Sequence, residues 1–377
     1  MARGLQGIPG EAEKLGAAVD PVGKVVARRF RAGRRLKQTS GTETLLGTDL
    51  SSGEAVVIKA VSTAALSAGT RMRLEHEAAL RHRVQSRWLS PLTHVSREEG
   101  LLYLVMPFVS GISLQRRLGR GPLALEEALT LGRCLFSALR DAHSHSVLHR
   151  DIKPSNVIVN DNVPLTNATL VDFGLARSVQ LDEALPGQPP ATALYASPEQ
   201  AGSIDCDVRD PSDLYSAGVL LFECLVGRVP FRGESVGAVL FEHMTAPVPE
   251  LRSLGLQVPR ALDEFLQRLL RKDPRDRYQS AEAALADLEA IDEALSRGET
   301  EPSVVIGVSD QRRTLTEPAF VGRQRELGQF DQQLDRARTG QPGLVVLEGE
   351  SGGGKTRLLV EAAQQGVREG FWVLRGQ

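Results

Sequence analysis

Cysteine is scarce in this 377-residue sequence, and neither sign of charge predominates. The three cysteines, Cys134, Cys206 and Cys224, are widely spaced, a pattern that forms no disulfide or zinc framework and suits a reducing compartment. The formal net charge of −2 gives no electrostatic basis for binding nucleic acid. The sequence therefore argues against a disulfide-stabilised secreted module and against a basic nucleic-acid-binding domain.

Long apolar runs are also absent. No stretch approaches the roughly 20 residues of a transmembrane helix, and the first 21 residues lack the apolar core of a secretory signal. Hydrophobic residues make up 41% of the chain and charged residues 24%, as in soluble globular proteins. We therefore expect a cytoplasmic protein of two to three domains, with no membrane or nucleic-acid partner.

Two short motifs carry most of the chemistry. They are His149-Arg150-Asp151-Ile152-Lys153-Pro154-Ser155-Asn156 and Asp172-Phe173-Gly174. Asp151 is suited to accept the proton of an attacking hydroxyl, and Lys153 to offset charge on a moving phosphoryl group. Asn156 and Asp172 offer the oxygen ligands that Mg²⁺ prefers. The two motifs in this order predict transfer of a phosphoryl group from ATP.

Histidine clustering offers a competing interpretation of the same region. His143, His145 and His149 lie close together in the sequence, as metal-binding histidines often do. No cysteine or carboxylate set completes such a site, and His149 already belongs to the first motif. The phosphoryl-transfer interpretation is therefore favoured.

The chain resembles eukaryotic-type serine/threonine protein kinases, as found in bacteria, over most of residues 30–290. Besides the two motifs, the matching segments are Val56–Lys59, Leu101–Met106, Ser197–Glu199, Ser212–Gly218 and Asp273–Arg277. The resemblance implies an α+β, two-lobed kinase fold with a small antiparallel β lobe that carries one helix and a large, mainly helical lobe. It also implies ATP and Mg²⁺ as cofactors and a protein substrate with a serine or threonine acceptor.

The resemblance assigns further residues to the nucleotide site. Lys59 would hold the α- and β-phosphates and pair with Glu77 on the following helix, with Glu75 as the alternative. Met106 would be the gatekeeper beside adenine, and Val109 part of the hinge between the lobes. In the large lobe, Arg277 would bind Glu199 in a bidentate ion pair that joins distant segments.

One part of the nucleotide site departs from the family. Lys37, Thr39 and Thr42 stand where three glycines usually let the backbone approach the phosphates. This favours weak or conditional kinase activity, and it leaves open a nucleotide-binding pseudokinase that acts as a scaffold. Between Gly174 and Thr192 only Ser178 carries a hydroxyl, so activation by phosphorylation of this loop has little support.

A second nucleotide motif lies near the C-terminus. Gly349 to Thr356 read Gly-Glu-Ser-Gly-Gly-Gly-Lys-Thr, between an apolar strand predicted over 343–348 and a helix predicted over 357–363. This is the order that a P-loop requires, with Gly349 and Gly354 in the phosphate cradle, Lys355 at the phosphates and Thr356 at Mg²⁺.

The segment before the P-loop, Phe320–Leu327, resembles the start of AAA and STAND signalling ATPases. We therefore expect the N-terminal part of such an α/β domain over residues 316–377, with further C-terminal domains in a longer parent. The predicted order is a flexible segment over 1–29, a kinase domain over 30–290, a linker over 291–315 and the ATPase part. The whole resembles large bacterial regulatory kinases, in which the ATPase module takes part in signal transduction.

Overall fold

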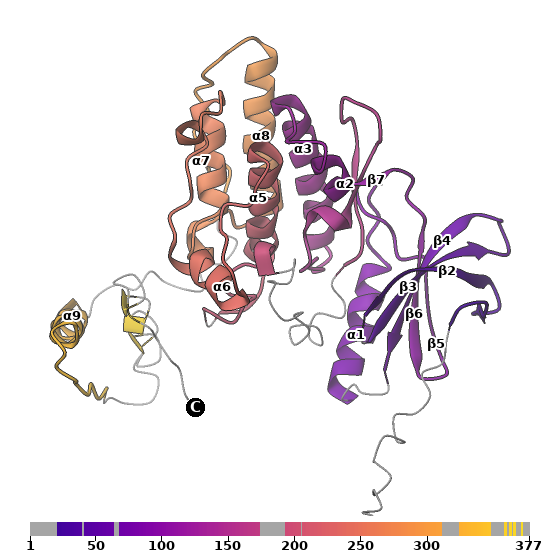
Figure 1. Ribbon diagram of the computed structural model, residues 1–377, viewed down its shortest axis with the longest axis horizontal. Coiled ribbons are helices and arrows are strands. Elements are labelled where there is room, and N and C mark those ends of the chain that lie inside the picture. Colours follow the sequence, from indigo (N-terminus) through magenta and orange to yellow (C-terminus); the bar gives the residue numbers. More distant parts are fainter. Residues whose placement is uncertain are drawn as a thin grey trace, which may run out of the picture.

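The computed structural model describes most of the predicted kinase region and a smaller share of the C-terminal residues. The described residues are 21–39, 41–63, 68–173, 193–204, 206–310, 324–347 and the positions 358, 359, 362, 363, 365, 366 and 371. Figure 1 shows two lobes, a β-rich one and a helical one, joined by the chain after β6. The predicted two-lobed α+β fold is confirmed.

The small lobe is built on a six-stranded antiparallel sheet with the order β1-β2-β3-β4-β6-β5. The strands are β1 (Val25–Val26), β2 (Phe30–Thr39), β3 (Thr42–Asp49), β4 (Ala55–Ser62), β5 (His94–Glu98) and β6 (Leu101–Pro107). Side chains alternate between the two faces of each strand. On β6, Tyr103 and Val105 therefore join a core on one face, whereas Leu102, Leu104 and Met106 join the core on the other.

Helix α1 (Ala68–Arg81) covers the second of these faces. Its buried side chains are Leu74, Ala78 and Arg81, spaced by four and three residues, which places them on one side of the helix. Leu74 and Ala78 pack into the same core as Leu104 of β6. The third buried position is thus occupied by an arginine, where the helical pattern predicts an apolar residue.

The large lobe is mainly helical and contains a small three-stranded sheet. Its helices are α2 (Leu114–Leu118), α3 (Leu125–His143), α5 (Asp210–Val226), α6 (Val236–Thr245), α7 (Arg260–Leu269) and α8 (Ala281–Ser296). The sheet has the order β7 (Ile112–Ser113), β8 (Val157–Val159) and β9 (Ala168–Leu170). Short 3₁₀ turns are η1 (Pro154–Asn156), η2 (Ala193–Tyr195), η3 (Arg252–Leu254) and η4 (Pro274–Asp276).

Helix α5 is the buried centre of this lobe, as predicted for the Ser212–Gly218 segment. Most of its residues, polar ones included, are buried. Gly218 allows α7 to approach closely, because a Cβ at this position would lie 2.9 Å from Leu269. Gly132 does the same between α3 and α8, where a Cβ would lie 2.6 Å from Leu288. Dense helix packing therefore supports the motif segments, which lie on the lobe's edge facing the small lobe.

The small lobe begins before residue 30. Strand β1 pairs with β2, and the Ala27 amide donates to Glu98 at 2.8 Å. Val25 and Val26, in the segment expected to be flexible, thus belong to the sheet, and Val26 is buried against the apolar side chains of β2 and β6. Residues 1–20 of that predicted segment lie outside the described residues.

The predicted linker over 291–315 is also part of the folded kinase region, as far as it is described. Helix α8 continues to Ser296, and Val304 and Ile306 pack against the large-lobe core. Gly307 donates its amide to Asp287 at 2.6 Å, and the Asp310 side chain is 1% exposed. A linker was expected because the segment is polar. In the structure, however, Gly307 binds Asp287 of α8 and Asp310 binds Arg268 of α7.

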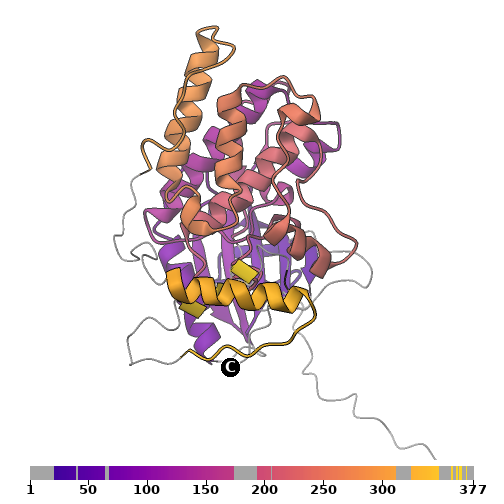
Figure 2. The same cartoon turned by 90° about the vertical axis from the view of Figure 1, so that its left-hand side faces the viewer.

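The C-terminal part contains α9 (Gln324–Arg338), which lies apart from the small-lobe sheet in Figure 1 and is drawn in front of the kinase lobes in Figure 2. The predicted strand over 343–348 is not found among residues 343–347, and Leu344 is 88% exposed. A strand needs a neighbouring strand to satisfy its backbone, and none pairs with this stretch among the described residues. Described positions of the predicted helix over 357–363 are helical, with Leu358 and Ala362 buried.

Among the residues that the structure describes, no helix is long and apolar enough to cross a membrane.

Candidate active site between the two lobes

The first motif folds into a compact polar cluster at the start of β8. Lys153 donates to the Asp151 carboxylate at 2.9 Å and 2.8 Å, and the Asn156 side-chain amide donates to the same carboxylate at 2.8 Å. Asn156 also donates to the Asp151 carbonyl oxygen at 2.8 Å. The tight turn η1, with Pro154 at its start, brings Asn156 back toward Asp151. The structure therefore brings the predicted base, cation and amide together.

The second motif places Asp172 opposite Lys59. The Lys59 Nζ atom lies 2.5 Å from Asp172 Oδ1, and the Lys59 side chain is 11% exposed. Lys59 points this way because alternation along β4 puts it on the face that α1 covers, opposite Leu104. Burial disfavours the charged form of Asp172, but the Lys59 ammonium outweighs it, with help from Arg81, and leaves the pKa of this carboxyl below its usual value.

Glu77 has a different partner from the one expected. Its carboxylate binds Arg150 of the first motif at 2.7 Å, and Glu75 lies 3.6 Å from Arg97. The predicted Lys59–Glu77 ion pair is therefore wrong for this conformation. Two other pairs form in its place, because Lys59 is bonded to the Asp172 carboxylate and Arg150 binds the Glu77 carboxylate.

Asp213, near the start of α5, binds the backbone of the first motif. It accepts hydrogen bonds from the amides of His149 (2.8 Å) and Arg150 (2.7 Å) and contacts His143 at 3.0 Å. Arg150 has a φ of 62°, an uncommon conformation for a residue with a side chain, and Asp213 stabilises it. Sequence reasoning placed Asp213 at the start of the central helix but missed this role, because its partners lie more than 60 residues away.

The adenine side of the site contains the predicted gatekeeper. Met106 is 4% exposed and pairs with Val57 of the neighbouring strand. After β6, the Phe108 amide donates to the Ala55 carbonyl at 3.1 Å, so the hinge begins as a continuation of the sheet. Val109 is half-buried next to this bond. Both residues border the junction of the lobes, and their contact with adenine stays a prediction.

The loop expected to cover the phosphates is a tight hairpin between β2 and β3. Lys37 pairs with Thr44, and Thr39 pairs with Thr42. The three residues that replace glycine therefore lie in paired strands. Close approaches between β2 and β3 themselves occur at Gly33 and Gly47, where a Cβ would lie 2.7 Å from the Leu46 carbonyl oxygen and 2.6 Å from the Arg31 carbonyl oxygen.

Arg81 is the functional candidate that sequence reasoning missed. Its guanidinium lies over the ring of Phe173, with Cζ 4.1 Å from the ring centroid, and donates to Met106 Sδ at 3.3 Å. Phe173 in turn packs against His149, with ring centroids 4.5 Å apart. The signal in the sequence was an arginine on the apolar side of a helix, three residues after Ala78.

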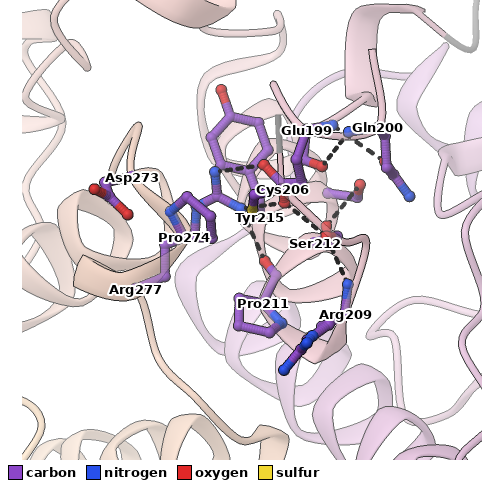
Figure 3. A network of polar contacts seen from close by, with 12 residues as sticks. Glu199, Gln200, Cys206, Arg209, Pro211, Ser212, Tyr215, Asp273, Pro274 and Arg277 are labelled. Carbon is purple, nitrogen blue, oxygen red and sulfur yellow. Dashed lines mark hydrogen bonds and ion pairs between the residues drawn. The ribbon is translucent and has the colours of Figure 1, made fainter. Parts of the chain in front are cut away.

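The predicted Glu199–Arg277 ion pair is confirmed (Figure 3). Arg277 donates to both carboxylate oxygens, at 2.7 Å and 3.0 Å, and both side chains are 0% exposed. Ser212 adds a bond to Glu199 at 2.6 Å, and Arg277 also donates to the carbonyl of Pro211. The pair therefore ties the segment after residue 193 to α5 and to the turn after α7.

Several predicted site residues lie outside the described residues. They are Gly174, Ser178, Thr192, Gly349, Gly354, Lys355 and Thr356. Within the described part of the chain, no group of three or more histidine, cysteine, aspartate or glutamate side chains could hold a metal ion. The alternative of a histidine cluster is not supported, since His143 faces Asp213 and His149 faces the Val171 carbonyl.

Comparison with known proteins agrees with this geometry. Residues 34–287 match the protein kinase domain family. The chain belongs to the protein kinase family. Residues 319–377 match the AAA ATPase domain family, so the kinase domain is followed by an AAA-type segment. Both parts of the predicted resemblance are confirmed.

The relatives are bacterial kinases. The chain is 35% identical over 225 residues to the serine/threonine-protein kinase PknH of Mycobacterium tuberculosis, which covers 59% of this chain and 35% of PknH. It is 29% identical over 282 residues to a probable serine/threonine-protein kinase PknB of Lactococcus lactis, 74% of this chain and 44% of the relative. The alignments thus span less than half the length of these relatives. The relatives' names identify the kinase domain as one of the serine/threonine type.

Solved structures share the fold. The kinase domain of Mycobacterium tuberculosis PknI superimposes with a TM-score of 0.53 at 22% identity, over 73% of this chain and 99% of that one. Rad53 1-466 in complex with AMP-PNP gives a TM-score of 0.55 at 21% identity, over 67% of this chain and 62% of that one. At these identities the likeness shows the fold alone.

Proposed function

We propose that this protein transfers the γ-phosphoryl group of ATP to serine or threonine side chains of proteins. The observation that carries the proposal is the cluster of Asp151, Lys153 and Asn156. Asp151 orients the acceptor hydroxyl and accepts its proton, and Lys153 offsets the charge of the transferred group.

The residues present suit a Mg²⁺–ATP complex. Asn156 uses its Nδ2 group to bind Asp151, and its oxygen, which accepts a 3.4 Å bond from the Ser155 hydroxyl, keeps a second lone pair for a cation. Asp172 supplies a carboxylate on the adjacent segment. Oxygen donors of this kind are those that Mg²⁺ prefers. Bound Mg²⁺ would neutralise part of the phosphate charge there. Lys59 holds the phosphates, and Met106 and Val109 border adenine.

The conformation described here is a resting one in this proposal. Lys59 is bonded to Asp172, and Glu77 is bonded to Arg150. To act, Lys59 exchanges Asp172 for the phosphates, and Glu77 exchanges Arg150 for Lys59. The first exchange frees the Asp172 carboxylate for Mg²⁺. The second releases Arg150, whose side chain is 38% exposed and can be solvated, so no buried charge loses its partner.

We also propose a cytoplasmic location and a second nucleotide site. All three cysteines are free, which suits a reducing compartment, and ATP is available there.

In the AAA-type segment, Gly349, Gly354, Lys355 and Thr356 would cradle the phosphates of a second nucleotide. We expect nucleotide titration to give one binding site fewer in Lys355→Ala than in wild type. Equal stoichiometry would overturn the second site and leave the kinase proposal intact.

The kinase proposal is tested by removing the proposed base. We expect Asp151→Asn to lower phosphate transfer from labelled ATP to a protein acceptor by about 10²–10⁴-fold, while nucleotide binding stays close to that of wild type. The matched control is Asp161→Asn, which removes an exposed aspartate that binds Arg120 on the surface. Equal phosphate incorporation by wild type and Asp151→Asn would contradict the assignment.

A nucleotide-binding pseudokinase that regulates the attached AAA-type segment is the second candidate. It is favoured by the glycine-poor hairpin, in which Lys37, Thr39 and Thr42 are paired residues of β2 and β3. In the same assay this function predicts nucleotide binding without phosphate incorporation in wild type. Glycine at the three positions should then tighten Mg²⁺–ATP binding, because the backbone could close on the phosphates.

A further inference from the structure

Arg81 introduces a positive charge at the centre of the kinase fold. It is the last residue of α1 and is 2% exposed, between the Phe173 ring and Met106. A buried arginine normally has a carboxylate partner, because taking an unpaired charge out of water is costly. Among the described residues, Arg81 forms no ion pair, and its Nε atom has no hydrogen-bond partner.

The neighbouring carboxylates are already bonded to other cations. Glu77, one turn earlier on α1, binds Arg150, and Asp172 binds Lys59. Arg81 is held instead by the ring of Phe173, the residue directly after Asp172. Its charge therefore acts on Asp172 through space rather than through a bond.

The charge state of both groups is consistent with this arrangement. Burial lowers the pKa of Arg81 to about 10, and the Asp172 carboxylate opposes part of that shift. Arg81 therefore stays charged at neutral pH. The same interaction contributes to the low pKa of Asp172.

From this geometry we propose that Arg81 is a positioning residue that competes electrostatically with Mg²⁺ for Asp172 and so raises the Mg²⁺ concentration that nucleotide binding requires. This inference rests on the proposed nucleotide site. The Arg81 guanidinium, held against Phe173 next to Asp172 in the chain, repels a divalent ion that approaches this carboxylate. Unlike Lys59, which can turn to the phosphates, Arg81 is enclosed by Phe173 and Met106 and cannot leave.

Packing and charge can be separated by substitution. Arg81→Met keeps an unbranched side chain between Phe173 and Met106 and removes the charge, whereas Arg81→Lys keeps the charge. Arg81→Leu is a second neutral variant, in case the methionine variant does not fold. The control is Arg83→Met, which removes an exposed arginine just beyond the end of α1 and so makes the same change in net charge.

The experiment measures binding of fluorescent ADP at increasing Mg²⁺ concentration, with the thermal unfolding midpoint recorded for each variant. We expect Arg81→Met to lower the half-saturating Mg²⁺ concentration by about tenfold, the size expected for one unit charge at short range in a partly screened site. Arg81→Lys should remain within about twofold of wild type, and Arg83→Met should leave the value unchanged.

The outcomes separate this inference from the proposed function. An unchanged or higher Mg²⁺ requirement in folded Arg81→Met and Arg81→Leu would overturn the inference alone, and Arg81 would then be a packing residue. Binding that appears only in the neutral variants would support it. If neither wild type nor any variant binds nucleotide at any Mg²⁺ concentration, both the nucleotide site and the inference are wrong.

Discussion

His149 is buried completely and must stay neutral in the folded protein. Its Nδ1 atom accepts from the Asp151 amide at 3.3 Å, and its Nε2 atom faces the Val171 carbonyl at 3.1 Å. A proton on Nδ1 would remove the first bond. Burial lowers the pKa of His149 to about 4, while the Asp213 carboxylate opposes the shift. His149, a residue of the first motif, therefore also makes the stability of the folded protein depend on pH.

The sign of this dependence comes from proton binding. Between pH 6.5 and about 4 the unfolded chain binds a proton at His149 and the folded chain does not, so stability falls as the pH falls. We expect wild type to lose about 2 kcal/mol relative to His149→Phe between pH 7.5 and 5, measured by urea unfolding.

Two controls define this test. His145→Gln changes an exposed histidine nearby and should not alter the difference. His143 acts in the opposite direction, because Asp213 outweighs burial and raises the pKa of this histidine, so its stabilising effect is lost as the pH rises. Comparing wild type with each single variant keeps the two effects apart. A pH-independent difference between wild type and His149→Phe would mean that this residue is not buried as a neutral group.

The Glu199–Arg277 pair matters at the scale of the elements that it joins. Arg277 bonds to three backbone carbonyls besides Glu199, those of Pro211, Arg271 and Lys272. The segment at 197–200, the start of α5 and the end of α7 therefore meet at one guanidinium. A lysine could not make this set of bonds, because the planar fork of arginine supplies the geometry.

Breaking this pair should be costly. We expect Arg277→Met to destabilise the kinase region by about 3–5 kcal/mol, because it leaves a buried carboxylate uncompensated. The exposed pair Arg297–Glu299 provides the control, since Arg297→Met should cost under about 1 kcal/mol. Denaturant unfolding measures both. Adding Glu199→Gln to Arg277→Met should restore part of the loss, and a fully additive double variant would show that the two residues are not coupled.

At the scale of the whole molecule, the connection to the AAA-type segment is anchored on the large lobe. Asp310 binds Arg268 at 2.7 Å and accepts from the backbone amide of Gln279 at 3.0 Å. The side-chain amide of Gln279 in turn donates to the Arg277 carbonyl at 2.9 Å. Residues 299–310 are therefore part of the kinase region.

Removing this anchor should affect the kinase region itself. We expect Asp310→Ala to lower its stability by about 1–3 kcal/mol, because the partly buried Gln279 amide loses its acceptor. Glu301→Gln is the control, since Glu301 is exposed, pairs with Arg252 and accepts from the Arg260 backbone amide, and glutamine keeps an oxygen acceptor there. Thermal or urea unfolding gives the comparison. Equal stabilities of Asp310→Ala and wild type would mean that residues 299–310 are a linker that does not stabilise the kinase region.

Local patterns were sufficient to predict the family, the two lobes and the membership of the catalytic cluster. Asp151, Lys153 and Asn156 lie within six residues, so a short turn brings them together whatever surrounds it. Lys59 lies on the covered face of the sheet by alternation along β4, but only the structure shows which face α1 covers. The Glu199–Arg277 pair was predicted because it belongs to the family pattern, and the buried geometry agrees with it.

Partner choice across the fold was decided by the tertiary structure. Lys59, Glu77 and Arg81 each depend on distances between segments that are far apart in the sequence, and charges in one site compete for the same few carboxylates. A polar segment such as 299–310 reads as a linker until its few buried side chains meet α7 and α8. Local chemistry is short-ranged along the chain, whereas burial and ion pairing are set by neighbours in space.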